Sequence, residues 1–267
     1  LLVSSAASDV YKRQNKNKIV IYTSIFGSYD GLIPQPQFKG VDYICFTDQP
    51  FKSSKWKIIT VSSKISDTTR KSRHPKILPH LYLNDYKYSI YIDGNILVLR
   101  NPKILFNKIL KNSPMGIYDH NQASDARNCV YKEHKAIIDI YNQRGILKDD
   151  LVTIKNQITR YKKQNYPHEN GLISATVLFR EHHNQQVKKT METWWNEIKN
   201  GSKRDQLSFN FSAWKNNFKP YIIDGDVRNN AYFYMLGKHR KSFLKKLITY
   251  RIKHLFGLIR HPKIHYD

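Results

Sequence analysis

Acidic residues, cysteines and long apolar runs are all scarce in this chain of 267 residues. The two cysteines, Cys45 and Cys129, have no paired spacing, which argues against a disulfide scaffold, a zinc site and a redox motif and fits a reducing compartment. There is no run of about 18 apolar residues and no apolar signal-peptide core near the start, so we expect no membrane-spanning helix. Only 21 Asp and Glu accompany 45 Lys and Arg, giving a net charge of +24. The surface must therefore attract polyanions, whether nucleic acid, anionic lipid or a phosphate-bearing substrate.

What the chain does contain is enough apolar residues, 40% of the total, to build one sizeable core. The stretch from Ser4 to Gln14, "SSAASDVYKRQ", back-translates to a sequence typical of a transposase-type sequencing adapter, so residues 1–14 are left out of fold reasoning. Alternatively, they form a disordered polar tail. We expect one domain over residues 15–240 and a basic amphipathic segment over residues 241–267.

Strand-like and helix-like patterns alternate along the chain. Short β-branched and aromatic runs predict strands at residues 18–25, 42–48, 56–61, 89–99 and 171–180. Apolar residues at helical spacing predict helices at residues 70–87, 103–110, 129–144, 152–165 and 185–199. This alternation predicts an α/β layered fold with a mainly parallel sheet, and ligands of such sheets bind beyond the carboxyl ends of the strands.

The stretch "SIYIDGNILVL" (89–99) places two polar side chains inside an apolar run. If the backbone stays extended, Asp93 and Asn95 face the same side, and Gly94 between them lets a ligand approach closely. Two oxygen ligands of this kind suit Mg²⁺ or Mn²⁺. The alternative is a turn, because Asp-Gly and Gly-Asn pairs are common in hairpins. These residues alone do not decide between the two.

Six segments, taken together in this order, resemble a glycosyltransferase-like family related to plant mucilage and pectin-forming proteins, within the GT-A type nucleotide-sugar transferases. The segments are "YTSIFGSYD" (22–30), "DYICFTD" (42–48), "RKSRHPKILPH" (70–80), "YIDGNI" (91–96), "RNCVYKEHKAI" (127–137) and "RDQLSF" (204–209). They extend over most of residues 18–240. The resemblance implies a GT-A-like, Rossmann-type three-layer fold, a nucleotide-diphosphate sugar donor, UDP-linked, and a divalent metal bound at the Asp-x-Asp-type motif.

The resemblance also implies roles for particular residues. Asp93 and Asn95 would hold the Mn²⁺ or Mg²⁺ ion, although the commoner motif has Asp where this chain has Asn95. Three cations of the basic run would contact the diphosphate, and two further residues would lie near the nucleoside. The cations are Arg70, Arg73 and Lys76, and the two others are Thr23 and Asp48. Metal and cations together would stabilise the negative charge that develops on the leaving diphosphate.

On the acceptor side, Asp205 in "KRDQLSF" is the expected catalytic residue, which would take the acceptor proton or orient the sugar. Its plainer interpretation is an N-terminal helix cap, and Glu169 in "PHENG" is the competing carboxylate. His239 is not included among the expected metal ligands, because a lone His beside a basic tail is more often solvated.

The segment "SFLKKLITYRIKHLFGLIR" (242–260) has the pattern of a basic amphipathic helix, with Phe243, Leu247, Leu255 and Phe256 among its apolar residues. It would either pack on the domain or attach to an anionic membrane, near glycan or lipid-linked acceptors. We therefore expect a cytoplasmic enzyme of surface polysaccharide synthesis, peripheral on the inner face of the cell membrane. The alternative function is nucleic-acid binding through the basic surface, but no recognisable module supports it and no nucleic-acid partner is expected.

Overall fold

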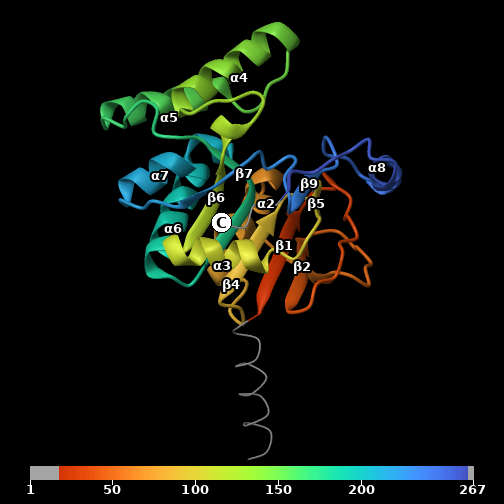
Figure 1. The fold of residues 1–267 in the computed structure, drawn as a ribbon. Coiled ribbons are helices and arrows are strands. Elements are labelled where there is room, and N and C mark those ends of the chain that lie inside the picture. The colour runs from red at the N-terminus through yellow and green to blue at the C-terminus, as the bar shows by residue number, and fades with distance from the viewer. Residues whose placement is uncertain (1–17, 264–267) are drawn as a thin grey trace, which may run out of the picture.

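The computed structural model describes residues 18–263 and contains a central sheet of seven strands (Figure 1). In spatial order these are β3 (Lys57–Thr60), β2 (Val41–Thr47), β1 (Ile19–Ile25), β4 (Tyr88–Ile92), β7 (Ile173–Glu181), β6 (Met115–Asp119) and β8 (Tyr221–Ile223). The predicted α/β fold is confirmed. The prediction for residues 1–14 lies outside the described residues.

The sheet is mostly parallel, as the alternating pattern predicts. β1 pairs in parallel with β2 and β4, β2 with β3, and β6 with β8. Only β7 runs antiparallel, against β4 on one side and β6 on the other. The amino end of β7 therefore lies at the same edge of the sheet as the carboxyl ends of its neighbours.

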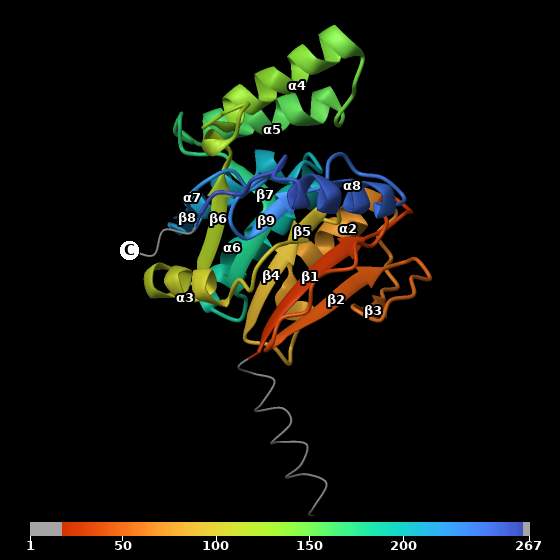
Figure 2. The same cartoon turned by 45° about the vertical axis from the view of Figure 1, so that its right-hand side comes forward.

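Helices and a small second sheet cover the two faces of the main sheet and complete three layers (Figure 2). One face packs against α2 (Thr68–Ile77), α6 (Gln185–Asn200) and α7 (Phe209–Lys215). The other packs against α3 (Lys103–Asn112) and against the antiparallel pair of β5 (Ile96–Val98) and β9 (Phe233–Met235). The apolar residues of the strands are thus buried from both sides, which explains their nearly continuous apolar runs.

Two expected elements differ from the structure. The strand expected over residues 89–99 is divided into β4 and β5, because the Asp93 carbonyl accepts a hydrogen bond from the Ile96 amide at 3.1 Å and closes a turn. The helix expected over residues 70–87 ends at Ile77, because Pro79 has no amide hydrogen and disfavours helical backbone at the residue before it. A short 3-10 helix, Pro79–Leu81, follows.

A helical hairpin of α4 (Val130–Arg144) and α5 (Leu151–Lys163) lies beyond one edge of the main sheet, where Figure 1 shows it at the top. The two helices share a hydrophobic cluster that includes Ile137, Ile158 and Tyr161 and that Leu207 and Phe211 of the main domain complete. Gly145 ends α4 in the left-handed conformation, with φ of 63°, as the sequence pattern indicates for this glycine.

The last helix, α8 (Leu244–Leu255), packs on the domain along one side. Phe243, Leu247 and Tyr250 are buried against Ile33 and Leu97. Phe243 and Leu247, expected on a membrane-facing side, are instead part of this cluster, because the domain offers them an apolar surface. Within residues 18–263, no helix is both long enough and apolar enough to cross a bilayer.

Candidate active site

A cavity of about 760 Å³ lies between the main sheet and the α4–α5 hairpin. Residues at the carboxyl ends of β1 and β4, in the segments that follow β6 and β8, and at the amino end of β7 contribute to its wall. Ligands of open α/β sheets bind at this edge. The cavity therefore has the position that the sequence predicts for the site.

Four charged residues meet at the centre of this wall. The Lys76 ammonium donates to Asp205 Oδ2 at 2.7 Å and to Asp93 Oδ1 at 3.3 Å, and the Arg73 guanidinium lies 3.1 Å from the same Asp205 oxygen. The Tyr91 hydroxyl donates to Asp93 Oδ1 at 2.8 Å. Lys76 is 1% exposed, so its charge is neutralised by the two carboxylates rather than by water. The structure thus brings together Arg73, Lys76, Asp93 and Asp205, four of the predicted site residues.

The surroundings of Asp205 keep its carboxyl group ionised. Burial alone would raise its pKa, but the Arg73 guanidinium and the Lys76 ammonium hold that pKa well below its usual range. A general base works best with a pKa near the pH of the reaction. The geometry therefore favours a permanently charged Asp205 that orients or stabilises a ligand over one that accepts a proton.

Asn95 does not face the cavity. Its amide nitrogen donates to the Gly237 carbonyl at 2.8 Å, and the side chain is almost fully buried. The turn at Asp93–Ile96 directs the side chain of Asn95 away from that of Asp93. Of the two interpretations of "DGN", an extended strand and a turn, the backbone follows the turn. Gly94 in this turn lies against Asp30, and a Cβ there would be 2.8 Å from Asp30 Oδ2.

Asp30 and His239 form a second polar pair on the wall. His239 Nδ1 lies 2.6 Å from Asp30 Oδ2, and the Arg240 amide donates to Asp30 Oδ1 at 3.0 Å. Burial lowers the pKa of His239, but the hydrogen bond and charge of Asp30, with a smaller effect of Asp93, leave that pKa above its ordinary value. Because Asp30 engages Nδ1, the ring's Nε2 is the nitrogen left for a ligand.

These donors can be compared with what a divalent cation requires. No group of three or more His, Cys, Asp or Glu among residues 18–263 is arranged to hold a metal. Mg²⁺ and similar ions, however, are commonly bound by one or two protein groups together with substrate phosphates and water. Asp93 and His239 both line the cavity and are the groups available for such a set, with Asp30 orienting the His ring as carboxylates do in many metal sites. This candidate set contains His239 in place of the predicted Asn95.

Other predicted residues lie away from the cavity wall. The Arg70 guanidinium donates to the carbonyls of Ile198 and Gly201 and so caps the end of α6. Thr23 is buried within β1. Asp48 accepts from the Gly27 amide at 2.9 Å and supports the loop after β1 from outside.

Glu169, the carboxylate that competes with Asp205 in the sequence interpretation, is also remote from the wall. Its side chain is 62% exposed and pairs with Lys132 at 2.8 Å. Neither residue lines the cavity.

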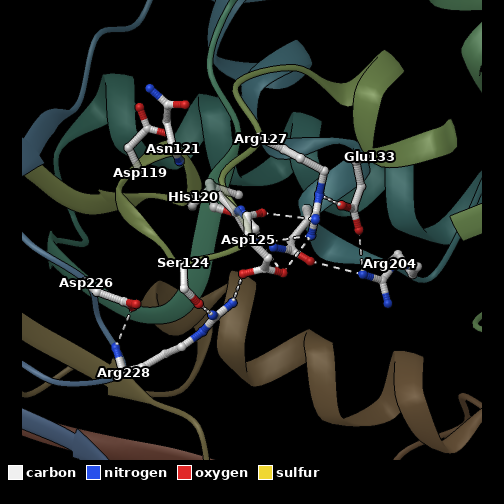
Figure 3. A network of polar contacts seen from close by, with 12 residues as sticks. Asp119, His120, Asn121, Ser124, Asp125, Arg127, Glu133, Arg204, Asp226 and Arg228 are labelled. Carbon is white, nitrogen blue, oxygen red and sulfur yellow. Dashed lines mark hydrogen bonds and ion pairs between the residues drawn. The ribbon is translucent and has the colours of Figure 1, made fainter. Parts of the chain in front are cut away.

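Beside Asp205, a network of arginines and carboxylates that includes Arg204 crosses the cavity wall (Figure 3). Asp125 accepts from Arg228 at 2.6 Å and from Arg127 at 3.2 Å. Glu133 of α4, which is 2% exposed, accepts from Arg127 at 2.7 Å and from Arg204 at 2.8 Å. The network connects the hairpin to the loops before Asp205 and after β8, and its three cations outnumber its two carboxylates.

Reasoning from the sequence missed Asp30, His239 and this network as site residues. Signals for some of them were present, since Asp30 ends the segment "YTSIFGSYD" and Arg127 and Glu133 belong to "RNCVYKEHKAI". Arg228 lies in none of the six segments and is brought to the site only by the fold.

The chain is similar to a family model, to a plant protein and to a solved structure. The family model "TOD1/MUCI70, glycosyltransferase-like domain" matches residues 5–235. A "Probable hexosyltransferase MUCI70" of Arabidopsis thaliana is 23% identical over 232 residues, which cover 76% of this chain and 38% of that relative. The crystal structure of mouse xyloside xylosyltransferase 1 in its apo form aligns with a TM-score of 0.43 and 9% identity, covering 78% of this chain and 84% of that one.

The family match extends over most of the chain, from the segment before β1 to the end of β9. It includes all four residues of the central charged cluster and all five of the network. The chain spans well under half the length of the curated relative that it matches. The chain belongs to the TOD1/MUCI70 glycosyltransferase-like domain family.

Proposed function

We propose that this protein transfers a sugar from a nucleotide-diphosphate donor, UDP-linked, to a glycan acceptor. The observation that carries the proposal is the cavity at the carboxyl edge of the sheet, whose wall combines unshared arginine nitrogens with ionised carboxylates. A family described as glycosyltransferase-like and a relative described as a probable hexosyltransferase support it.

Arg73 is the residue best placed to bind the diphosphate. It lines the cavity, and its contact with Asp205 uses only the Nε side of the guanidinium. The two terminal nitrogens remain for phosphate oxygens, which arginine binds well in a bidentate manner. Fixed positive charge at this point would stabilise the diphosphate as it leaves the anomeric carbon.

A divalent cation, Mn²⁺ or Mg²⁺, would be held by Asp93 and His239 and would supply further charge stabilisation to the phosphates. Asp205, kept ionised by Arg73 and Lys76, would lie beside the sugar and favour positive charge developing at the anomeric carbon. The network of Asp125, Glu133 and their arginines offers further donors and acceptors for sugar hydroxyls on the cavity wall. A glycan or lipid-linked acceptor would enter from this side.

Thermal melting with UDP tests this proposal. A nucleotide at about 100 times its Kd stabilises a protein by about 2.7 kcal/mol, which raises the melting temperature of a domain of this size by roughly 5–11 °C. We expect such a shift with UDP and Mn²⁺, a smaller one with UDP alone, and release of UDP from at least one UDP-sugar. Arg73→Gln should abolish the shift.

The matched control is Arg144→Gln, which removes the same charge at the exposed end of α4. This variant should respond to UDP as the unmodified chain does. Stabilisation by oligonucleotides with a steep salt dependence, and none by UDP, would instead support the nucleic-acid alternative and contradict the proposal.

A further inference from the structure

α8 presents two apolar sides, and only one of them is covered. Phe243, Leu247 and Tyr250 pack into the domain. A second row faces solvent along the helix and the turn that follows it. Its members, which we call the exposed stripe, are Leu244, Ile248, Ile252, Leu255, Phe256 and Leu258.

The exposed stripe follows from the periodicity of the helix. Leu244, Ile248, Ile252 and Phe256 are four residues apart and so lie on one side, with Leu255 beside them. Leu255 is 81% exposed, and Phe256 is 73% exposed. Single exposed apolar residues are ordinary, but a continuous row of them marks an interaction surface.

The charge around the exposed stripe has one sign. Lys245, Lys246, Arg251 and Lys253 are all exposed on α8. Between Val227 and Tyr266 the sequence contains no Asp or Glu. A second copy of the chain would bring an equally basic surface to the same place and be repelled. The complementary partner must therefore be both apolar and anionic.

We propose that the exposed stripe of α8 binds the surface of an anionic lipid bilayer. Aliphatic side chains with Phe256 would enter the region between headgroups and acyl chains, while the lysines would contact the headgroups. The packed side of α8 fixes the helix to the domain, so the helix would lie in the plane of the membrane. This inference does not depend on the proposed enzymatic function.

The fold also links this surface to the cavity. The residues just before α8 bond to the loop after β1, since the Gly31 amide donates to the Arg240 carbonyl at 2.8 Å and Arg240 donates to Asp30. Figures 1 and 2 both show α8 near the edge of the sheet that faces the hairpin. Attachment through α8 would therefore place the cavity close to the membrane.

Vesicle co-sedimentation tests the proposal with the full chain. We expect binding to vesicles of phosphatidylcholine with phosphatidylglycerol, and little binding to phosphatidylcholine alone. The triple variant Lys245→Gln, Lys246→Gln and Lys253→Gln should bind roughly 100-fold more weakly, as the contribution of each basic residue near an anionic surface indicates. Leu255→Ser with Phe256→Ser should weaken binding by a similar factor. Both variants change only exposed side chains, so their melting temperatures should stay unchanged.

The matched control is Ile104→Ser, an equivalent change at an exposed apolar residue of α3. Its binding should equal that of the unmodified chain. Three results would overturn the proposal. The first is an absence of binding to anionic vesicles, and the second is binding that the control weakens as much as Leu255→Ser with Phe256→Ser does. The third is equal binding to soluble poly-glutamate that the loss of Leu255 and Phe256 does not affect, which would show an acidic protein partner.

Discussion

Replacing Lys76 with methionine tests the central charged cluster most directly. The ammonium is 1% exposed and lies 2.7 Å from Asp205 and 3.3 Å from Asp93. Methionine keeps most of the volume but removes the charge, which leaves Asp205 with Arg73 as its ion-pair partner and with the Gln206 amide, and leaves Asp93 with the Tyr91 hydroxyl. Breaking a buried ion pair on one side costs about 3–5 kcal/mol of unfolding free energy. For a domain of this size the melting temperature should fall by roughly 6–20 °C.

The matched control is Lys71→Met, the same change five residues earlier on α2, at a lysine that forms no ion pair among residues 18–263. It should cost less than about 0.5 kcal/mol. Denaturant unfolding of both variants and of Lys76→Met with Asp205→Asn completes the measurement. The double variant should lose less than the sum of the single losses, because the two groups interact directly. Equal stability of Lys76→Met and Lys71→Met would refute the reasoning.

Three further outcomes follow from the same contacts. Asp205→Asn should destabilise the protein at pH 7, and the difference should shrink as pH falls below about 4. The stability that the lowered pKa of Asp205 contributes is complete above the unfolded pKa and is lost as pH falls from there toward the folded pKa. A pH-independent difference in urea unfolding would contradict this. Asn95→Asp should lower the unfolding free energy by about 1–3 kcal/mol, since a buried carboxylate would face the Gly237 carbonyl; unchanged urea unfolding would refute it. Gly94→Ala should weaken the response to UDP and Mn²⁺ by displacing Asp30, and an unaltered thermal shift would disprove that link.

Much of the fold follows from patterns that are local in the sequence. Short β-branched runs become buried strands, and apolar residues at helical spacing become helices, as in the case of α6 with its buried Trp194. The antiparallel direction of β7 could not be predicted in this way, because a buried strand has the same apolar pattern in either direction.

The site was predictable only in part. Arg73, Lys76, Asp93 and Asp205 were all singled out in the sequence, but their pairing with one another depends on distances across the fold. Asn95 is the opposite case, since residues i and i+2 share a face only while the backbone stays extended. A single hydrogen bond that closes the turn at Asp93 directs its side chain elsewhere.

The hydrophobic cluster of α4 and α5 has a consequence for the motions of this protein. Leu207 and Phe211 of the main domain complete the cluster, so the hairpin can open and close as one cooperative unit only by exposing this shared surface, at a lower free energy than global unfolding. The ion pairs of Glu133 with Arg127 and Arg204 connect that unit to the body of the protein. Amide hydrogens of α4 should therefore exchange with solvent together and earlier than those of β1 and β4. A ligand held between the hairpin and the sheet would slow that exchange, which makes α4 an internal reporter of occupancy.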